Sequence, residues 1–218
     1  MPCILIVDDH PLYRQALAQL VTSVLPDARV REGTNLAEAR AALADDDIDL
    51  VLLDLHLPDS HGLMGLVALR GEFPAIPVAM VSAHEDAAIA RRALAYGACA
   101  YVPKRSDAAE LARALRTALA GGIHHPDWLD GDEDPNASRS DGELAARLGR
   151  LSPQQFRVLQ LVAEGMLNKQ IADRLGVQER TVKAHLTAIF ERLGVRNRTQ
   201  AGVLLRSLEP GGAVGSDW

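Results

Sequence analysis

The chain has 218 residues and a formal net charge of -6, a length that suits one large domain or two small ones. Hydrophobic residues make up 48% of it, which excludes a chain that is disordered throughout. The charge is uneven, since residues 150–218 carry a net +4 and the preceding part a net -10. An acidic first part and a basic last part indicate two functions, the second of them a candidate for nucleic-acid binding. Chance drift of charge along a chain is the alternative.

The two cysteines, Cys3 and Cys99, each lie in a short apolar run. They predict buried free thiols in a reducing compartment, and no cysteine spacing typical of a metal site is present. The run Ile4–Val7 is too short for a signal peptide and lacks a basic start. No run reaches the length of a transmembrane helix. We therefore expect a soluble, cytoplasmic protein.

Short apolar runs alternate with helical patterns over the first 121 residues. Several runs are apolar throughout, as strands covered on both faces of a parallel sheet must be. The alternation predicts an α/β domain with a doubly wound, five-stranded parallel sheet and right-handed crossovers. We expect strands at Ile4–Val7, Ala28–Arg31, Leu50–Leu53, Val78–Val81 and Cys99–Val102, and helices at about 11–25, 35–44, 62–72, 86–95 and 107–120.

The pattern changes at Gly121-Gly122. Residues 122–149 are rich in Gly, Pro, Asp and Ser and predict a flexible acidic linker, with at most a short helix at Glu143–Leu148. Residues 150–208 predict a small all-α domain whose second and third helices match the helix-turn-helix pattern. Residues 209–218 predict a disordered tail. The helix signals are a capping box at Ser152–Gln155, caps at Asn168 and Thr199, and stops at Gly165, Gly176 and Gly194.

Polar residues follow four of the predicted strands: Asp8 and Asp9 the first, Asp54 the third, Ser82 the fourth and Lys104 the fifth. The carboxyl ends of parallel strands meet at one edge of a sheet, so these side chains should lie together. Carboxylates gathered there suit Mg²⁺, which prefers oxygen ligands. A carboxylate beside the metal can attack phosphorus and form an acyl phosphate, while a hydroxyl and an ammonium neutralise phosphoryl oxygens. Alternatively, such aspartates are turn residues and helix caps.

These residues resemble the receiver domain of two-component response regulators across about residues 1–121. The resemblance rests on Asp8-Asp9, Asp54–Asp59, Gly62, Ser82-Ala83 and Tyr101–Lys104. One departure is Ala100, which stands where the family usually has glycine.

The resemblance implies roles for individual residues. A histidine kinase would phosphorylate Asp54, and Ser82 and Lys104 would contact the phosphoryl group. Mg²⁺ would be held by Asp8 or Asp9, by Asp54 and by the backbone carbonyl of His56. Tyr101 would be an aromatic switch that turns inward when Ser82 is drawn to the phosphate, although a plain strand aromatic is the alternative. His56 and His84 would flank the route of the attacking water and set the phosphoryl lifetime, although plain exposed loop histidines are the alternative.

Residues 151–206 resemble the LuxR/NarL-type helix-turn-helix domain. The matching residues are Leu151–Pro153, Val158-Leu159, Ala163–Gly165, Asn168-Lys169, Ile171-Ala172, Leu175–Val177, Thr181–His185, Leu193–Val195 and Asn197–Thr199. Gln178 replaces a usual Ser or Thr and predicts a poorer cap for the third helix. In this family the last helix makes the dimer contact on DNA, for which Val203 and Leu204 are candidates, although both suit the core of the domain equally well.

The third predicted helix has two faces. Val182, Leu186, Ile189 and Leu193 recur at the spacing of a core stripe. Lys183, Ala184 and Thr187 then face outward, where they would contact base edges in the major groove. Phosphate contacts are expected from Asn168, Lys169, Arg180, Thr181 and His185. Each of these residues alone is also consistent with a solvated surface.

The sequence thus predicts a response-regulator transcription factor. Phosphorylation of Asp54 would shift the domain arrangement and dimerisation, whereas the unphosphorylated receiver would mask or misplace the helix-turn-helix. The expected partners are a histidine kinase, double-stranded DNA and a second copy of the chain. Beyond Mg²⁺-dependent self-phosphorylation and dephosphorylation, no enzymatic activity is expected.

Three alternatives remain open. An aspartyl-nucleophile phosphatase of the dehalogenase type would need a second Asp where His56 stands. The chain could also be a DNA-binding protein with a vestigial receiver. A regulator that acts by protein contact alone is the third.

Overall fold

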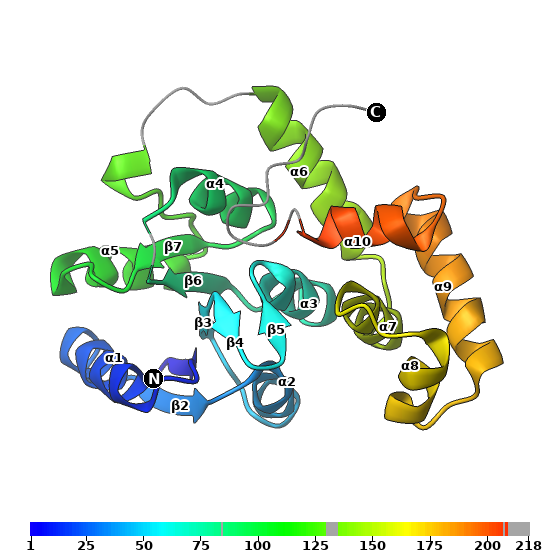
Figure 1. Ribbon diagram of the computed structural model, residues 1–218. Coiled ribbons are helices and arrows are strands. Elements are labelled where there is room, and N and C mark those ends of the chain that lie inside the picture. The colour runs from blue at the N-terminus through cyan, green and yellow to red at the C-terminus, as the bar shows by residue number, and fades with distance from the viewer. Residues whose placement is uncertain (84, 130–134, 207, 209–218) are drawn as a thin grey trace.

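The computed structural model describes residues 1–83, 85–129, 135–206 and 208. The first domain is built on a five-stranded sheet in the order β2-β1-β3-β6-β7, with every neighbouring pair parallel (Figure 1). The strands are β1 (Cys3–Val7), β2 (Arg29–Gly33), β3 (Leu50–Asp54), β6 (Val78–Ser82) and β7 (Ala100–Pro103). This confirms the predicted doubly wound sheet. The order reverses between β1 and β3, and ligands of such sheets bind at that reversal.

Helices cover both faces of the sheet. On one face, α1 (Pro11–Val24) and α5 (Ala108–Leu119) bury residues such as Leu17 and Leu115. On the other face lie α2 (Leu36–Asp45), α3 (Met64–Glu72) and α4 (Ala87–Ala95). All five helices occur where the sequence predicts them, within two residues at each end.

A short hairpin that the sequence does not predict follows β3. In it, β4 (His56–Leu57) pairs antiparallel with β5 (Ser60–His61). Asp59 lies in its turn, and its carboxylate accepts hydrogen bonds of 2.8 and 2.9 Å from the N–H groups of Leu36 and Ala37 at the start of α2. Strands of two residues have no periodicity, so the sequence carries no signal for them.

The segment between the domains has more structure than predicted. His124 bonds to the β7 edge through its N–H, 2.8 Å from the Cys99 carbonyl. A 3-10 helix, η1 (Asp127–Leu129), and a full helix, α6 (Pro135–Leu148), follow. Helix α6 packs on α4 and buries Leu148. Contacts with α4, which is distant in the sequence, stabilise this helix. The local composition alone therefore indicated a flexible linker with only a short helix.

The second domain contains α7 (Pro153–Ala163), α8 (Asn168–Leu175), α9 (Glu179–Leu193) and α10 (Arg198–Arg206). The predicted capping box is confirmed: Ser152 and Gln155 exchange hydrogen bonds of 3.0 and 3.3 Å. Gly176 and Gly194 end α8 and α9 in the left-handed conformation.

Two predicted helix caps are wrong. Asn168 is the first residue inside α8, and the cap position belongs to Leu167, whose N–H donates to Gln170. At α10 the side chain that accepts from the Gln200 N–H is Asn197, not Thr199. At α10 the acceptor for a free N–H group lies two residues before the predicted one. At α8 the N-cap side chain makes no hydrogen bond, and Gln170, the third residue of the helix, accepts from the N-cap N–H. Gln178 makes no side-chain cap bond, as its poor capping character predicted.

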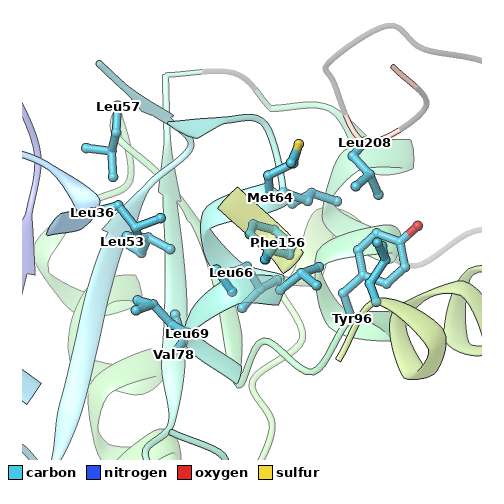
Figure 2. Packing of buried hydrophobic residues seen from close by; sticks show 14 of the residues in the cluster. Leu36, Leu53, Leu57, Met64, Leu66, Leu69, Val78, Tyr96, Phe156 and Leu208 are labelled. Carbon is cyan, nitrogen blue, oxygen red and sulfur yellow. The ribbon is translucent and has the colours of Figure 1, made fainter. Parts of the chain in front are cut away.

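The two domains pack against each other. Figure 2 shows Phe156 of α7 and Leu208, which follows α10, in one cluster with Leu66 and Met64 of α3. The Leu208 carbonyl accepts a 3.0 Å hydrogen bond from the N–H of Leu63, just before α3. Leu208, just after the last helix of the second domain, is therefore attached to the segment that leads from β3 into α3.

Candidate functional site

An acidic cluster lies where β1 and β3 end. Asp8 is 1% exposed and Asp54 4% exposed, whereas Asp9 is exposed to solvent. Asp8, Asp9, His10 and Asp54 each offer a ligand atom, and these atoms lie within 4.8 Å of one another. The sequence prediction of one shared edge is confirmed for the three aspartates.

Lys104, just after β7, reaches into this cluster. Its Nζ lies 3.0 Å from Asp54 Oδ2, as a hydrogen bond, and 2.7 Å from Asp8 Oδ2, as an ion pair outside hydrogen-bonding geometry. Burial raises the pKa of the Asp54 carboxyl, and the Lys104 ammonium and the main-chain N–H of His56 oppose that shift only in part. One ammonium facing several carboxylates leaves the cluster acidic. These oxygen donors fit a hard dication such as Mg²⁺.

His10 belongs to the same cluster, although the sequence analysis did not include it. Its Nδ1 lies 2.8 Å from Asp9 Oδ1, 3.3 Å from Asp8 Oδ1 and 3.9 Å from Asp54 Oδ2. The available signal was its place directly after the acidic pair. Tyr13, in the first turn of α1, was also missed: its ring lies against the Lys104 ammonium.

The remaining predicted receiver residues surround this cluster. Ser82 is buried at the end of β6, where its carbonyl accepts a 2.6 Å hydrogen bond from the Lys104 N–H. The side chain of His56 is exposed. His84 lies outside the described residues.

Tyr101, the predicted switch, is fully buried in β7. Its ring meets that of Trp128 edge-on, with centroids 6.2 Å apart. Burial raises the pKa of its hydroxyl, and a hydrogen bond with Ser82 counters the shift. The ring is thus already inward, with the segment between the domains packed over it.

The candidate nucleic-acid surface is the outer face of α9. Val182, Leu186, Ile189 and Leu193 are buried, which confirms the core stripe. Lys183, Ala184 and Thr187 are exposed on the opposite side, with the Lys183 side chain 64% exposed. Helix α9 lies at the outer edge of the molecule (Figure 1).

The candidate phosphate contacts flank this face. Lys169 and Arg180 are exposed, and Thr181 and His185 are half-buried. The side chain of Asn168 accepts a 3.3 Å hydrogen bond from Arg198. In this domain arrangement, therefore, the face predicted to meet DNA is open.

A receiver-like α/β domain with an acidic, lysine-paired sheet edge, joined to a helix-turn-helix, defines a signal-responsive regulator of transcription.

Within the described residues, no helix combines the length and the apolar character needed to cross a membrane. Comparison with known proteins agrees with this class. The model of the response regulator receiver domain matches residues 4–116. The model of the luxR family of bacterial regulatory proteins matches residues 150–205.

Relatives match across both domains. The glycerol metabolism activator of Pseudomonas putida is 39% identical, over 91% of this chain and 92% of its own. The nitrate/nitrite response regulator NarL of Escherichia coli K12 is 34% identical, over 92% of this chain and 93% of the NarL chain. A solved complex of the response regulator RcsB with DNA is 22% identical and has the same fold, with a TM-score of 0.55 over 94% of this chain and 98% of that one. The chain belongs to the two-component response regulators with a LuxR-type DNA-binding domain.

Proposed function

We propose that Asp54 accepts a phosphoryl group from a histidine kinase. A carboxylate oxygen of Asp54 would attack the phosphorus of the phosphohistidine, the new P–O bond would form as the P–N bond breaks, and the imidazole would leave. The observation that carries this proposal is the pairing of the buried Asp54 carboxylate with the Lys104 ammonium at 3.0 Å.

The residues around Asp54 would stabilise the phosphoryl group and hold the metal ion. Lys104 and the hydroxyl of Ser82 would take up charge on the phosphoryl oxygens. Asp8 or Asp9, Asp54 and the backbone carbonyl of His56 would hold Mg²⁺, which neutralises the negative charge that gathers there. The fit is supported by Asp8 Oδ2, which is buried and has no hydrogen-bond partner among the described residues.

DNA binding is assigned to α9. Lys183, Ala184 and Thr187 would contact base edges, because they share the exposed face opposite the core stripe. Contacts to phosphates would come from Asn168, Lys169, Arg180, Thr181 and His185. Such contacts make the affinity depend on salt.

Control would act on the arrangement of the domains. Because the outer face of α9 is open, the geometry favours misplacing of the helix-turn-helix over masking. Two attachments would hold the resting arrangement. One is the hydrogen bond between the Leu63 N–H and the Leu208 carbonyl, in the segment between β3 and α3. The other is made by Asp141 of α6, whose carboxylate lies 3.3 Å from the Tyr96 hydroxyl and 3.5 Å from Arg92 Nε. A full reversal of the two populations would need roughly 10⁴-fold differential stabilisation.

Phosphorylation would also promote a homodimer. Val203 on α10 is 51% exposed and free to meet a second copy, whereas Leu204 is half-buried against the core of its own domain. The chain would act in the cytoplasm, where the buried free thiols of Cys3 and Cys99 stay reduced.

The test compares wild type with Asp54→Asn, each incubated with acetyl phosphate and Mg²⁺. A phosphate-affinity gel measures phosphorylation and size-exclusion chromatography measures association. We expect a shifted, dimerising wild type and an unshifted variant. If neither acetyl phosphate nor any kinase shifts the wild type, the vestigial receiver becomes the better account and the helix-turn-helix assignment is untouched.

A further inference from the structure

Three groups of the described residues lie against the Lys104 ammonium. Two are the carboxylates of Asp8 and Asp54, 2.7 and 3.0 Å away. The third is the ring of Tyr13, whose centroid lies 4.5 Å from Nζ. Tyr13 stands in the first turn of α1, which begins at Pro11 directly after the acidic residues. The ring is therefore fixed to the same loop as the carboxylates that it adjoins.

The two carboxylates are poor anchors during phosphoryl transfer. Asp54 becomes an acyl phosphate, and a dication that binds to Asp8 and Asp54 competes with Lys104 for their oxygens and repels its ammonium. The face of an aromatic ring attracts a cation through the ring quadrupole, without any change of charge. Of the three contacts, only the ring keeps its character through the reaction.

The charge state of Tyr13 supports this role. Burial, together with the nearby charges of Asp8 and Asp54, raises the pKa of its hydroxyl to about 12. A tyrosine is already neutral at physiological pH, and the raised pKa keeps Tyr13 so; its side chain offers the ammonium a ring face rather than a phenolate.

A cavity beside Lys104 offers the side chain another position, away from the acidic cluster. A cavity of about 170 Å³ lies between α1 and α5, with Tyr13, Leu20, Val102 and Leu111 in its walls together with Lys104 itself. The four-carbon stem of a lysine packs readily against such an apolar surface. Tyr13 therefore both lines this cavity and contacts the Lys104 ammonium.

We propose that Tyr13 is a positioning residue that holds the Lys104 ammonium at the phosphoryl position when its ion pairs break. This inference rests on the proposed role of Asp54. Tyr13→Leu should then slow phosphorylation by acetyl phosphate about three- to tenfold, the range that a partly desolvated cation–π contact supplies. Tyr13→Phe keeps the ring and should retain the wild-type rate. The control is Leu20→Ala, which removes apolar volume from the same cavity and the same helix.

A second readout does not depend on phosphorylation. The lysines of the chain are Lys104, Lys169 and Lys183, so lysine-selective ¹³C labelling gives a simple spectrum in which Lys104→Arg assigns the Lys104 signal. A ring face against the ammonium shifts the ε-methylene protons upfield. We expect that shift in wild type, Tyr13→Phe and Leu20→Ala, and its loss in Tyr13→Leu. Thermal unfolding checks that each variant is folded.

The outcomes separate the two proposals. Loss of the shift together with a slower rate in Tyr13→Leu alone supports the positioning role. A wild-type rate in folded Tyr13→Leu overturns it and leaves the role of Asp54 intact. An equal slowing in Tyr13→Leu and Leu20→Ala also overturns it, because cavity packing would then be the cause. If the wild type takes up no phosphoryl group from acetyl phosphate or from any kinase, the role of Asp54 fails and the inference fails with it.

Discussion

The acidic edge of the sheet and the outer face of α9 are built in opposite ways. Asp8, Asp54 and Lys104 come from the ends of three different strands and are held together in a largely buried cluster. Lys183, Ala184 and Thr187 come from a single helix and are exposed. Within the buried cluster a change at one charge alters the cost of burying the others, whereas residues on the helix face can be changed one at a time.

The largest effect is expected at Lys104. In Lys104→Met, the Asp8 and Asp54 carboxylates lose the ammonium that balances them, and breaking such a pair costs about 3 kcal/mol. Urea unfolding in Mg²⁺-free buffer at pH 7 measures this loss, which added Mg²⁺ should reduce. The control is Arg105→Met at a side chain that is 70% exposed, where we expect a change within about 0.5 kcal/mol. Equal losses in the two variants would refute the mutual dependence of the cluster.

On α9 the effect should fall on binding alone. Lys183→Ala should weaken DNA binding by about 1–3 kcal/mol and leave the free energy of unfolding within about 0.5 kcal/mol of wild type. Arg157→Ala removes the same charge from an exposed position on α7 and serves as the control. Titrations with a duplex selected by the protein from a random-sequence library measure both. If Arg157→Ala weakens binding equally, Lys183 contributes only general charge.

The attachment of α6 to α4 should contribute an intermediate amount. Asp141→Asn weakens the contacts with Arg92 and Tyr96 and should cost about 1.5 kcal/mol. Limited proteolysis between the two domains should become faster, because the domains separate more often. Asp173→Asn, at an exposed site on α8, is the control. An unchanged proteolysis rate in Asp141→Asn would show that this contact does not hold the domains together.

The smallest effect is a pH dependence at Asp54. Its pKa is raised in the folded state by burial, so its protonated form stabilises the fold below its unfolded pKa, and this stabilisation is lost as the pH rises through the folded pKa. Without Mg²⁺, Asp54→Asn should match wild type in acid and exceed it at pH 7 by on the order of 1 kcal/mol. Thermal unfolding across this pH range measures the gap in stability between Asp54→Asn and wild type. A gap that widens toward acid would contradict the raised pKa.

The same contrast explains how far the sequence could predict this molecule. Strand ends are visible as apolar runs, so Asp8, Asp54, Ser82 and Lys104 could be assigned to one edge before any geometry was known. The core stripe of α9 could be found because helical spacing is a local property. Each of these features depends on a few neighbouring residues.

Features that depend on distant contacts could not be predicted. Helix α6 is stabilised by α4, and the weak helical signal of its own sequence indicated only a short helix. His10 and Tyr13 join the acidic cluster through the path of the chain into α1, which no spacing rule describes. The N-cap position of α8 falls on Leu167, whose side chain has no acceptor, and at α10 the acceptor is Asn197, two residues before the predicted Thr199.

The central claim is that phosphorylation of Asp54 controls DNA binding by the open face of α9, because it changes the arrangement of the two domains and promotes a homodimer. The most direct test is a DNA titration with the selected duplex at fixed salt, using full-length wild type and Asp54→Asn, each with and without acetyl phosphate and Mg²⁺. We predict that phosphorylation tightens binding by wild type and makes it more steeply dependent on protein concentration, while Asp54→Asn does not respond. Equal affinities for phosphorylated and unphosphorylated wild type would contradict the claim.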